Sequence, residues 1–418
     1  MSAALVRRVL AAMPVIDGHN DLPTALRARA GYSVAGLDGH RPELHTDIPR
    51  LRAGGVGGQF WSVYVPSHLP EPEAVAATLE QIDAVYRLAA TYPETFTIAY
   101  TAADTERVIR EGRIASLIGV EGGHSLAGSL GVLRSFARLG VRYLTLTHND
   151  NTAWADSATD KPAVGGLTDV GRAIVTELNR LGILVDLSHV AASTQRDALD
   201  ASTAPVIFSH SSARSVNDHP RNVADPELHR LRTNGGVVQL TFVPAFVSAD
   251  VAEWTLAALA ERQRLDLPVP WTWPRAPRPG ESAAAVRAEA VQPPADDRFS
   301  RWLAAHPRPA VSLAQVADHV DHARDVAGVA HVGLGGDYDG VDWLPAELAD
   351  VSGYPRLLGE LADRGWSGAD LEALTGRNIL RVLRDAEDVA EAPLWPVQPV
   401  RSARRPLAGS RRGRGRRR

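Results

Sequence analysis

The sequence predicts an α/β fold in which eight parallel strands close into a (β/α)8 barrel of the TIM type. Eight short segments rich in apolar residues or glycine alternate with patterns of helical period. Apolar strands separated by amphipathic helices indicate a parallel sheet whose outer face is covered. Eight is also the number of strands that closes this barrel. The predicted strands are residues 14–21, 54–65, 114–122, 141–148, 182–189, 204–210, 235–242 and 331–337.

Helical patterns lie between most of these strands and after the last one. In each of them, apolar residues recur at the spacing that places them on one face of a helix. The predicted helices are residues 73–90, 102–111, 129–139, 168–181, 192–202, 225–233, 313–328, 354–364 and 367–384.

The alternation is interrupted between the seventh and eighth strands, where we place an insertion at residues 250–310. Its part from 266 to 310 is rich in Pro and Ala and contains three tryptophans. Long loops at the functional face of a barrel often act as lids or as dimer contacts. We therefore expect the insertion to border the functional site, and residues 1–390 to form one domain that includes it.

Residues 391–418 form a tail rich in Pro and Arg, which we expect to be disordered. Its last 18 residues contain nine arginines and no acidic residue, while the whole chain has a formal net charge of −4. The rest of the chain is therefore acidic. A basic tail could bind nucleic acid or an acidic surface. Nothing in the body supports nucleic-acid binding, so we interpret the tail as a solvated extension.

The composition is that of a soluble protein with a large core. The chain has 418 residues, of which 44% are hydrophobic. It has no cysteine, which excludes disulfides, thiolate metal ligands and cysteine nucleophiles. No apolar run approaches the roughly 20 residues that span a bilayer. The N-terminal segment has two arginines and a short apolar stretch, which we interpret as an amphipathic helix and not as a signal peptide. We expect a cytoplasmic location.

Four of the predicted strands end in side chains that bind metal ions. The segments are PVIDGHND, SLIGVEGG, ILVDLSH and PVIFSH, which begin at residues 14, 116, 183 and 205. Polar groups at the C-terminal ends of parallel strands are typical of the active site of a barrel. Three imidazoles and two carboxylates suit two zinc-like ions, with one carboxylate as a bridge. The candidate ligands are His19, Asp21, Glu121, His189 and His210.

Each candidate has a simpler interpretation when it is taken alone. An H-x-D tripeptide is common, Glu121 could form a structural salt bridge, and a single buried histidine is more often a core residue than a ligand. Their joint occurrence at strand ends favours the metal site. Lys161 is the only lysine and lies in a loop, which excludes a carboxylated-lysine bridge and a Schiff base. The chain has no G-x-S-x-G elbow, so serine-nucleophile chemistry also lacks support.

Longer motifs resemble those of a known family. The chain is similar to the renal, or membrane, dipeptidase family of zinc metallopeptidases, which belongs to the amidohydrolase superfamily. The resemblance covers most of residues 14–385, in the order of the family. The matching motifs are VIDGHNDLP, LRAGGVGGQFWSVY, ASLIGVEGGHSL, RYLTLTHNDNTAWADS, LNRLGILVDLSHV, APVIFSHSSARSV, RNV, LAQVADHVDH and GLGGDYDG.

The resemblance implies a metal cofactor of two Zn²⁺ per chain. By it, His19 and Asp21 bind one ion, and His189 and His210 bind the second. Glu121 bridges the two ions, together with a hydroxide. A water shared by two such ions loses a proton near neutral pH and could then attack a peptide carbonyl.

The resemblance also implies which residues handle the substrate. His148 matches the histidine that binds the substrate and stabilises the oxyanion. Asp337 matches the proton shuttle, which moves a proton from the attacking water to the leaving amine and also contacts the substrate. Arg221 matches the arginine that captures the C-terminal carboxylate of the substrate.

The predicted function is therefore that of a zinc dipeptidase. It would cleave dipeptides with a free C-terminal carboxylate, including those with a D-residue at that end. The membrane-attached relatives are secreted, disulfide-bearing and lipid-anchored, whereas this chain has no cysteine and no hydrophobic C-terminal anchor signal. It therefore resembles a soluble member of the bacterial type, with no membrane anchor, and the family suggests a homodimer.

Two alternatives stay open. Another hydrolase of the same superfamily, acting on a different small amide, a cyclic amide or a lactone, would keep the metals. More remotely, the chain could be a non-catalytic protein that binds a partner through its basic tail.

Other polar residues receive a structural interpretation. We expect His124 to support the site or the fold, and we expect His319 and His322 on the outer face of a helix and not at a third metal. Asp17 could orient a ligand or serve in packing.

Overall fold

The computed structural model describes residues 2–267 and 296–391 of the chain. Almost the whole predicted tail and the middle of the predicted insertion lie outside the described residues. The division into a domain of residues 1–390 and a disordered tail therefore stays a prediction.

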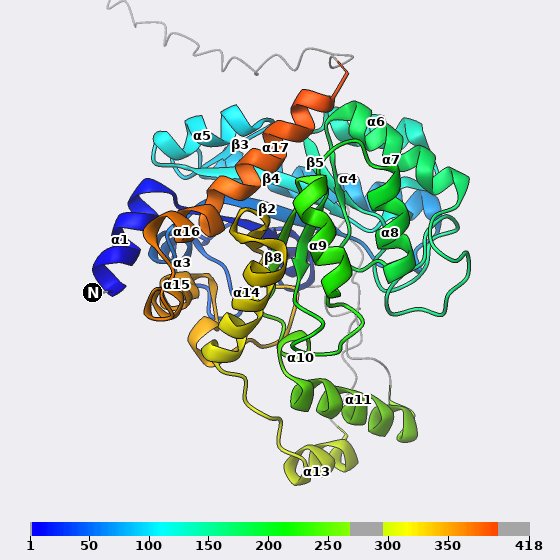
Figure 1. The fold of residues 1–418 in the computed structure, drawn as a ribbon. Helices are drawn as coiled ribbons and strands as arrows, with labels where there is room; N and C mark the ends of the chain where they lie inside the picture. Colours follow the sequence, from blue (N-terminus) through cyan, green and yellow to red (C-terminus); the bar gives the residue numbers. More distant parts are fainter. Residues whose placement is uncertain (1, 268–295, 392–418) are drawn as a thin grey trace, which may run out of the picture.

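Eight parallel strands close into a barrel, which confirms the predicted fold class (Figure 1). Every strand pairs with its neighbours in the parallel sense, in the order β2-β1-β9-β8-β7-β6-β5-β4, and pairing of β2 with β4 closes the ring. The barrel strands are β1 Val15–Asn20, β2 Val56–Tyr64, β4 Ile114–Glu121, β5 Val141–Thr145, β6 Leu184–Asp186, β7 Ile207–Ser211, β8 Val237–Leu240 and β9 Val332–Leu334.

The sheet differs from the prediction in two ways. A ninth strand, β3 (Phe96–Ile98), pairs with the start of β4, and its three residues are too few to show a period in the sequence. Several predicted strands also extend too far at their C-terminal ends. His189 (φ 70°) and Asp337 (φ 60°) have left-handed backbone, which a strand cannot contain. The chain therefore leaves the sheet before these residues and turns them over the end of the barrel.

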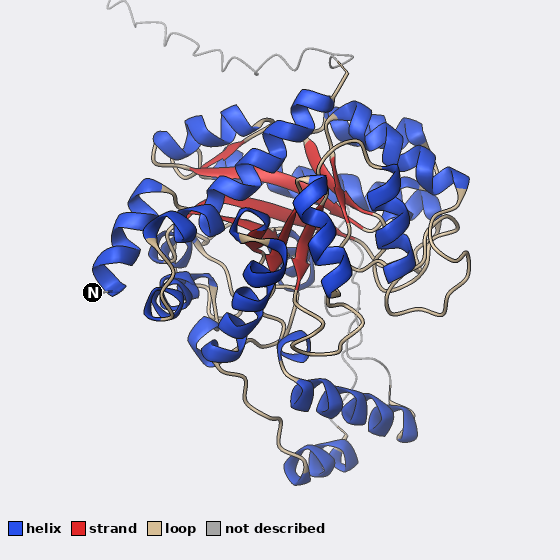
Figure 2. Ribbon diagram, in the orientation of Figure 1, coloured by secondary structure: helices blue, strands red, loops and turns tan. Residues whose placement is uncertain are grey.

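Helices surround the sheet, as the sequence predicts (Figure 2). The α-helices are α1 Ser2–Ala12, α2 Leu22–Ala30, α3 Ile48–Ala53, α4 Glu71–Thr91, α5 Ala102–Arg110, α6 Leu130–Arg138, α7 Asp169–Leu181, α8 Ala192–Ala201, α9 Asp225–Asn234, α10 Pro244–Val247, α11 Ala249–Arg264, α13 Asp297–Ala305, α14 Leu313–Ala327, α15 Tyr354–Asp363, α16 Gly368–Glu372 and α17 Asn378–Val389. Short 3₁₀ helices are η1 Gly123–Leu126, η2 Val329–His331, η3 Ala346–Leu348 and η4 Val351–Gly353.

The predicted helix 367–384 is present but is not α-helical throughout. A π-helical turn, Ala373–Arg377, lies between α16 and α17. Helix α17 then crosses the N-terminal end of the barrel, where Arg381 donates to the carbonyl of Gly235 just before β8 (2.6 Å) (Figure 1). Its apolar side chains join the cluster formed by residues inside the barrel, so the end opposite the predicted ligands is closed.

One aromatic side chain inside the barrel extends from the apolar cluster to the predicted ligands. Tyr143 on β5 is fully buried, and its hydroxyl lies 2.9 Å from Nδ1 of His19. A side chain at Gly119 of the adjacent β4 would place its Cβ 1.9 Å from the Tyr143 ring. Glycine at this position therefore provides the space that the tyrosine occupies.

The predicted insertion starts at the functional end of the barrel. Helix α10 follows β8 directly, and α11 and α13 lie beside each other away from the barrel (Figure 1). Trp254 of α11 donates to the carbonyl of His306 after α13 (2.8 Å) and its ring lies 6.3 Å from that of Trp302. These two contacts join α11 and α13 into one arm.

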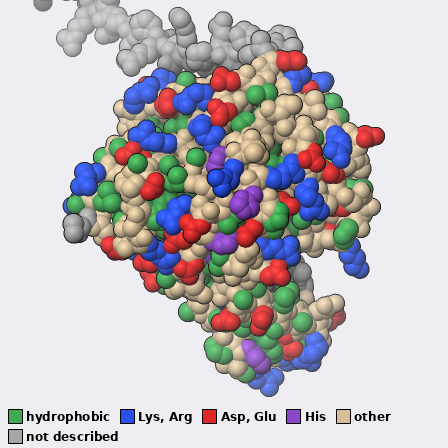
Figure 3. Space-filling model, viewed as in Figure 1, with side chains coloured by type: hydrophobic (Ala, Val, Ile, Leu, Met, Phe, Trp, Pro, Cys, Tyr) green, Lys and Arg blue, Asp and Glu red, His purple; other side chains and the backbone are tan. Residues whose placement is uncertain are grey.

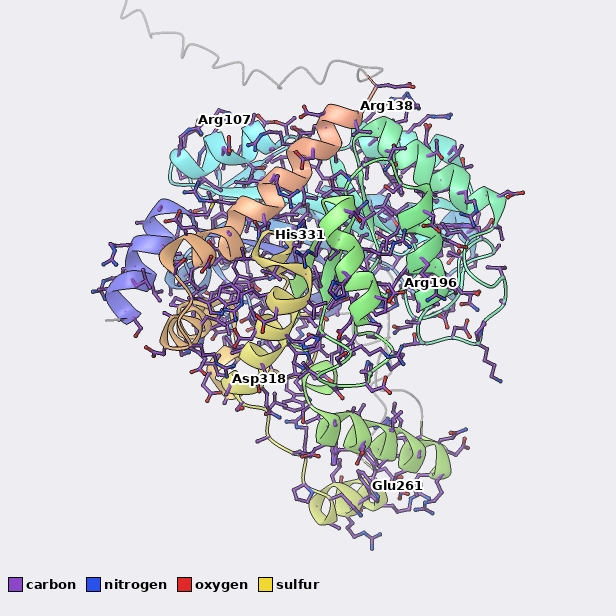
Figure 4. The ribbon with its side chains drawn as sticks, viewed as in Figure 1. Arg107, Arg138, Arg196, Glu261, Asp318 and His331 are labelled. Carbon is purple, nitrogen blue, oxygen red and sulfur yellow. The ribbon has the colours of Figure 1, made fainter. Side chains whose placement is uncertain are left out.

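Charged side chains of both signs are mixed on the face that α17 crosses (Figure 3). On α5, Arg107 donates to Asp104 (3.0 Å); on α14, Asp318 accepts from Arg364 (2.7 Å) (Figure 4). Pairs this exposed contribute about 0–1 kcal/mol each. Within residues 2–267 and 296–391, no helix has the length and apolar character needed to cross a bilayer.

Candidate functional site

The predicted site residues meet at one cavity of about 350 Å³ at the C-terminal end of the barrel. They come from the ends of β1, β4, β5, β6, β7 and β9 and the loops that follow. Seven of the eight line the cavity, and His19 lies fully buried beneath it. The lining residues are Asp21, Thr24, Tyr64, Glu121, His148, Asn149, His189, His210, Arg221, Val243, Phe246, Asp337, Asp339, Gly340 and Val341.

Glu121 lies at the centre of this group, and its two carboxylate oxygens face different partners. Oε2 lies 3.6 Å from Nε2 of His19 and accepts from Ser62 (3.1 Å). Oε1 lies 3.0 Å from Nε2 of His189 and 3.4 Å from Nε2 of His210. A carboxylate placed in this way could bridge two metal ions.

The first half of the site is formed by the end of β1. Nε2 of His19 lies 3.2 Å from Oδ2 of Asp21. This nitrogen is buried and has no hydrogen-bond partner among the described residues. A buried polar atom without a partner is costly, so a ligand at this position would remove the cost.

The second half is formed by the ends of β6 and β7. Nε2 of His189 and Nε2 of His210 lie 2.9 Å apart, which brings two nitrogen donors to one point. Burial lowers the pKa of both imidazoles well below the usual value, and Arg221 acts in the same direction. Both rings are therefore neutral near pH 7, which is the form that binds a metal ion.

These side chains fit a divalent metal ion. Within the described residues, three overlapping groups bring their ligand atoms within 4.8 Å of one another. All the donors are imidazole nitrogens or carboxylate oxygens, which suit zinc and similar ions. The groups are His19 with Glu121 and His210, Glu121 with His148 and His189, and His19 with Asp21 and Asp337.

The turn after β9 shows why its sequence is rich in glycine. Asp337 and Asp339 both have left-handed backbone (φ 60° and 64°), which is uncommon for residues with a side chain and frequent at functional sites. A Cβ at Gly340 would lie 2.2 Å from Asp337 and 2.4 Å from Asp21. At Gly335 it would lie 1.9 Å from a backbone carbonyl of β7. Glycine is therefore required where the backbone approaches the site.

Asp337 is buried but reaches the cavity, with 8% of its surface exposed. Burial raises the pKa of its carboxyl to about 8; the charges of Asp21 and Glu121 act in the same direction, while His19 and Arg221 oppose them. A carboxyl with a pKa in this range exchanges its proton close to neutral pH, as proton transfer in catalysis requires.

His148 lies at the mouth of the cavity, three residues beyond β5. Its ring stacks on that of His189 (centroids 4.3 Å apart) and lies 4.4 Å from that of Tyr64. Ser157 donates to the His148 carbonyl (2.6 Å) and so holds its backbone in place. Burial lowers the pKa of the imidazole to about 4, so the ring is neutral and can donate one N–H.

Arg221 is a buried cation with free donors. It lies on the loop after β7 and is 3% exposed. Its Nη2 lies 2.8 Å from Nε2 of His210, but Nε and Nη1 have no partner among the described residues. The Phe246 ring lies 5.1 Å from the guanidinium. An anion that enters the cavity could pair with one of these free donors.

Sequence reasoning missed two aromatic residues that pack against the site residues. Tyr143 carries no functional pattern of its own, although its place in an apolar strand opposite a glycine is a weak signal. Phe246, which packs on Arg221, follows β8 in a helix too short to predict. Among the described residues of the expected insertion, 250–267 and 296–310, none lines the cavity; its remaining residues lie outside the described part of the chain, so its place at the site stays a prediction.

The other histidines play structural roles. The prediction for His319 was wrong: it is fully buried, with ring nitrogens 3.1 Å from the Ala213 amide and 3.0 Å from the Val247 carbonyl. Helix α14 packs against α9 and α10, so this face is an inner one. His322 lies 2.8 Å from Asp225. His124 contacts the Val65 carbonyl (2.7 Å), a structural role as predicted.

A (β/α)8 barrel with imidazoles and carboxylates gathered at its C-terminal end has the arrangement of a metal-dependent enzyme. The family model for membrane dipeptidase (peptidase family M19) matches residues 3–396, and the chain belongs to this family of metal-dependent dipeptidases. It is 40% identical over 398 residues to an uncharacterized dipeptidase of Schizosaccharomyces pombe, covering 92% of this chain and 83% of that relative.

Two solved structures share the fold. The probable dipeptidase PvdM from Pseudomonas aeruginosa superimposes with a TM-score of 0.77 at 24% identity, over 93% of this chain and 99% of that chain. A metallopeptidase from Rhodobacter sphaeroides superimposes with a TM-score of 0.69 at 24% identity, over 90% of this chain and 99% of that chain. That structure is liganded with a phosphinate mimic of the dipeptide L-Ala-D-Ala.

Proposed function

We propose that this protein hydrolyses dipeptides that have a free C-terminal carboxylate, including those with a D-residue at that end, with the help of two zinc ions. The observation that carries the substrate class is the buried guanidinium of Arg221, which lines the cavity beside the candidate ligands and has two nitrogens without a partner among the described residues.

The metal ions would be held by the two halves of the site. His19 and Asp21 would hold one ion, His189 and His210 the other, and Glu121 would bridge them. When bound, the pair of ions would supply a hydroxide nucleophile at neutral pH and polarise the carbonyl of the substrate. The separate orientation of the two Glu121 oxygens supports this assignment.

Arg221 would bind the C-terminal carboxylate of the dipeptide. Its planar guanidinium offers a charged N–H donor, and the pair would form in a site from which most water is excluded. The scissile carbonyl, one residue away from that carboxylate, would then lie towards Glu121. His148 would donate its N–H to the oxyanion that develops on the carbonyl oxygen.

Asp337 would move the proton. It would accept the proton that the attacking water loses and would donate it to the nitrogen of the C-terminal residue as the peptide bond breaks. The raised pKa of its carboxyl, to about 8, supports both roles near neutral pH.

Acceptance of a D-residue is supported by the structure of the metallopeptidase from Rhodobacter sphaeroides, which was liganded with a mimic of L-Ala-D-Ala. A cyclic amide or a lactone lacks the free carboxylate and would leave the donors of Arg221 unpaired. We therefore rank hydrolysis of such substrates below dipeptide cleavage. The homodimer and the cytoplasmic location stay predictions, and light scattering after size exclusion would test the first.

The test is turnover of a panel of L,L and L,D dipeptides, each paired with its C-terminal amide, by protein in which the metal content is counted. The amide removes only the carboxylate charge. We expect about two metals per chain and much faster cleavage of the acids than of the amides. Metal binding with equal turnover of acids and amides would contradict the role of Arg221, and absence of turnover of both would contradict the dipeptidase assignment.

A further inference from the structure

A buried carboxylate, Asp186, lies beneath the cavity at the last residue of β6. Its Oδ1 accepts from the amides of Ser188 (3.1 Å) and Ser209 (2.8 Å). Its Oδ2 accepts from the hydroxyls of Ser209 (2.6 Å) and Thr145. These four donors satisfy the carboxylate without an ion pair in the described part of the chain, and they join β5, β6 and β7.

One of these donors links Asp186 to the ring of His210. The Ser209 hydroxyl has a single hydrogen, which it donates to Asp186, because an ionised carboxylate only accepts. The oxygen of Ser209 also lies 2.9 Å from Nδ1 of His210. It must therefore accept there, and Nδ1 of His210 must carry the ring hydrogen.

The contact of the other ring nitrogen of His210, Nε2, indicates the same position for the ring hydrogen. Nε2 of His210 lies 2.8 Å from Nη2 of Arg221. A guanidinium can only donate, so Nε2 must accept and carries its lone pair in place of a hydrogen. This lone pair is on the side of the ring that faces Glu121, whose Oε1 lies 3.4 Å away. Two independent sets of obligatory donors and acceptors thus agree on one tautomer.

We propose that Asp186 and Ser209 are positioning residues that hold His210 in the Nδ1–H tautomer and so present Nε2 to the metal site. The inference rests on the proposed function for the metal, but the proton position does not. A hydrogen bond from the outer nitrogen of a metal-binding histidine fixes the ring and its tautomer, and its loss typically costs 10- to 100-fold in metal affinity.

The arrangement predicts that Asp186→Asn has a larger effect than the loss of the serine hydroxyl. The two backbone amides require an acceptor, so the amide oxygen of the asparagine takes the place of Oδ1. Its NH₂ group then faces Ser209, whose hydroxyl must turn and donate to Nδ1 of His210. The ring hydrogen moves to Nε2, where it blocks metal binding and removes the acceptor of Arg221 Nη2, which must turn away from the ring. Ser209→Ala removes the hydrogen bond but does not force this reversal.

The experiment measures zinc affinity against a competing chelator with the full-length chain. Ser211→Ala is the matched control, because Ser211 is a buried serine of the same strand whose hydroxyl lies 3.2 Å from Ser188 and not at the ring. We expect wild-type affinity for Ser211→Ala, about 10-fold weaker binding of one ion for Ser209→Ala, and about 100-fold for Asp186→Asn. Ser209→Thr retains the hydroxyl and should restore the affinity.

A second measurement reads the proton directly. Nitrogen-15 NMR of the metal-free protein, with the His210 signals assigned by their absence in His210→Gln, should show Nδ1–H in the wild type and Nε2–H in Asp186→Asn. The same tautomer in both proteins would overturn the inference, as would equal zinc affinity of Ser209→Ala and Ser211→Ala. If Asp186→Asn does not fold, the two serine variants decide.

The failure of the proposed function gives a different result. Wild-type protein that binds no zinc would refute the metal site, while the NMR comparison would still decide whether Asp186 and Ser209 set the tautomer.

Discussion

Replacement of Arg221 by methionine should weaken substrate binding and, in the empty protein, raise stability. The guanidinium is 3% exposed, and two of its nitrogens have no partner among the described residues. Methionine keeps much of the length of the side chain but removes the charge and every donor.

The size of the catalytic effect follows from the pair with the substrate carboxylate. Loss of one partner of a buried hydrogen-bonded charge pair costs about 2–5 kcal/mol. This free energy corresponds to a fall in kcat/KM of roughly 30-fold to several thousand-fold, which we expect mainly in KM.

The stability effect has the opposite sign. Burial lowers the pKa of Arg221 to about 10, although Glu121, Asp337 and Asp186 favour its charge. A lowered pKa means that folding disfavours the charged form, at a cost on the order of 3 kcal/mol. Removal of the charge should therefore raise the free energy of unfolding of the metal-free protein. The expected gain is about 1–3 kcal/mol once the loss of the contact with His210 is subtracted.

Two assays check this prediction: steady-state kinetics with a dipeptide and with its C-terminal amide, and urea denaturation of the metal-free proteins. The variant and the wild type should handle the amide equally. The reasoning is refuted if the loss of activity is the same for both substrates, or if the variant unfolds at lower urea than the wild type.

The remaining predictions concern the metal site, the barrel interior and one pH-dependent cap. Glu121→Gln should lower the number of bound metal ions below that of the wild type, as counted by emission spectroscopy; an unchanged count would exclude the bridging role. Asp337→Asn should lower kcat by at least about 100-fold with the metal count unchanged, and a change confined to KM would argue against proton transfer. Gly119→Ala should cost about 1–3 kcal/mol or more, because its Cβ would meet the Tyr143 ring at 1.9 Å; wild-type thermal stability would contradict this packing argument. The cap is Asp47, the N-cap residue of α3. Burial raises the pKa of its carboxyl, but the backbone amides of Arg41 and Arg50 and the charge of Arg50 outweigh burial and hold the pKa below the usual value. Its contribution is therefore present above the unfolded pKa near 4 and is lost as the pH falls through the lower folded pKa. Asp47→Asn should destabilise by about 1–3 kcal/mol at pH 7 and progressively less below pH 4, and a constant difference would disprove the linkage.

The candidate ligands could be predicted because each follows an apolar strand in a recognisable motif. His19, Glu121 and His210 stand at the ends of β1, β4 and β7, and the period of the sequence already places these ends together. His319 could not be placed in the same way. Its helix has polar residues on both sides, and only the packing of α14 against α10 shows that the ring faces inward.

The sequence by itself determined the alternation of strands and helices, the family and the set of metal-binding side chains, because these depend on local periodicity and on residue type. Only the tertiary structure decided that the two oxygens of Glu121 face different histidines and that Asp186 reaches His210 through Ser209. It also decided that two nitrogens of Arg221 have no partner among the described residues. These relations join side chains that lie far apart in the sequence or on different strands. They are set by distances of about 3 Å that no pattern along one strand contains.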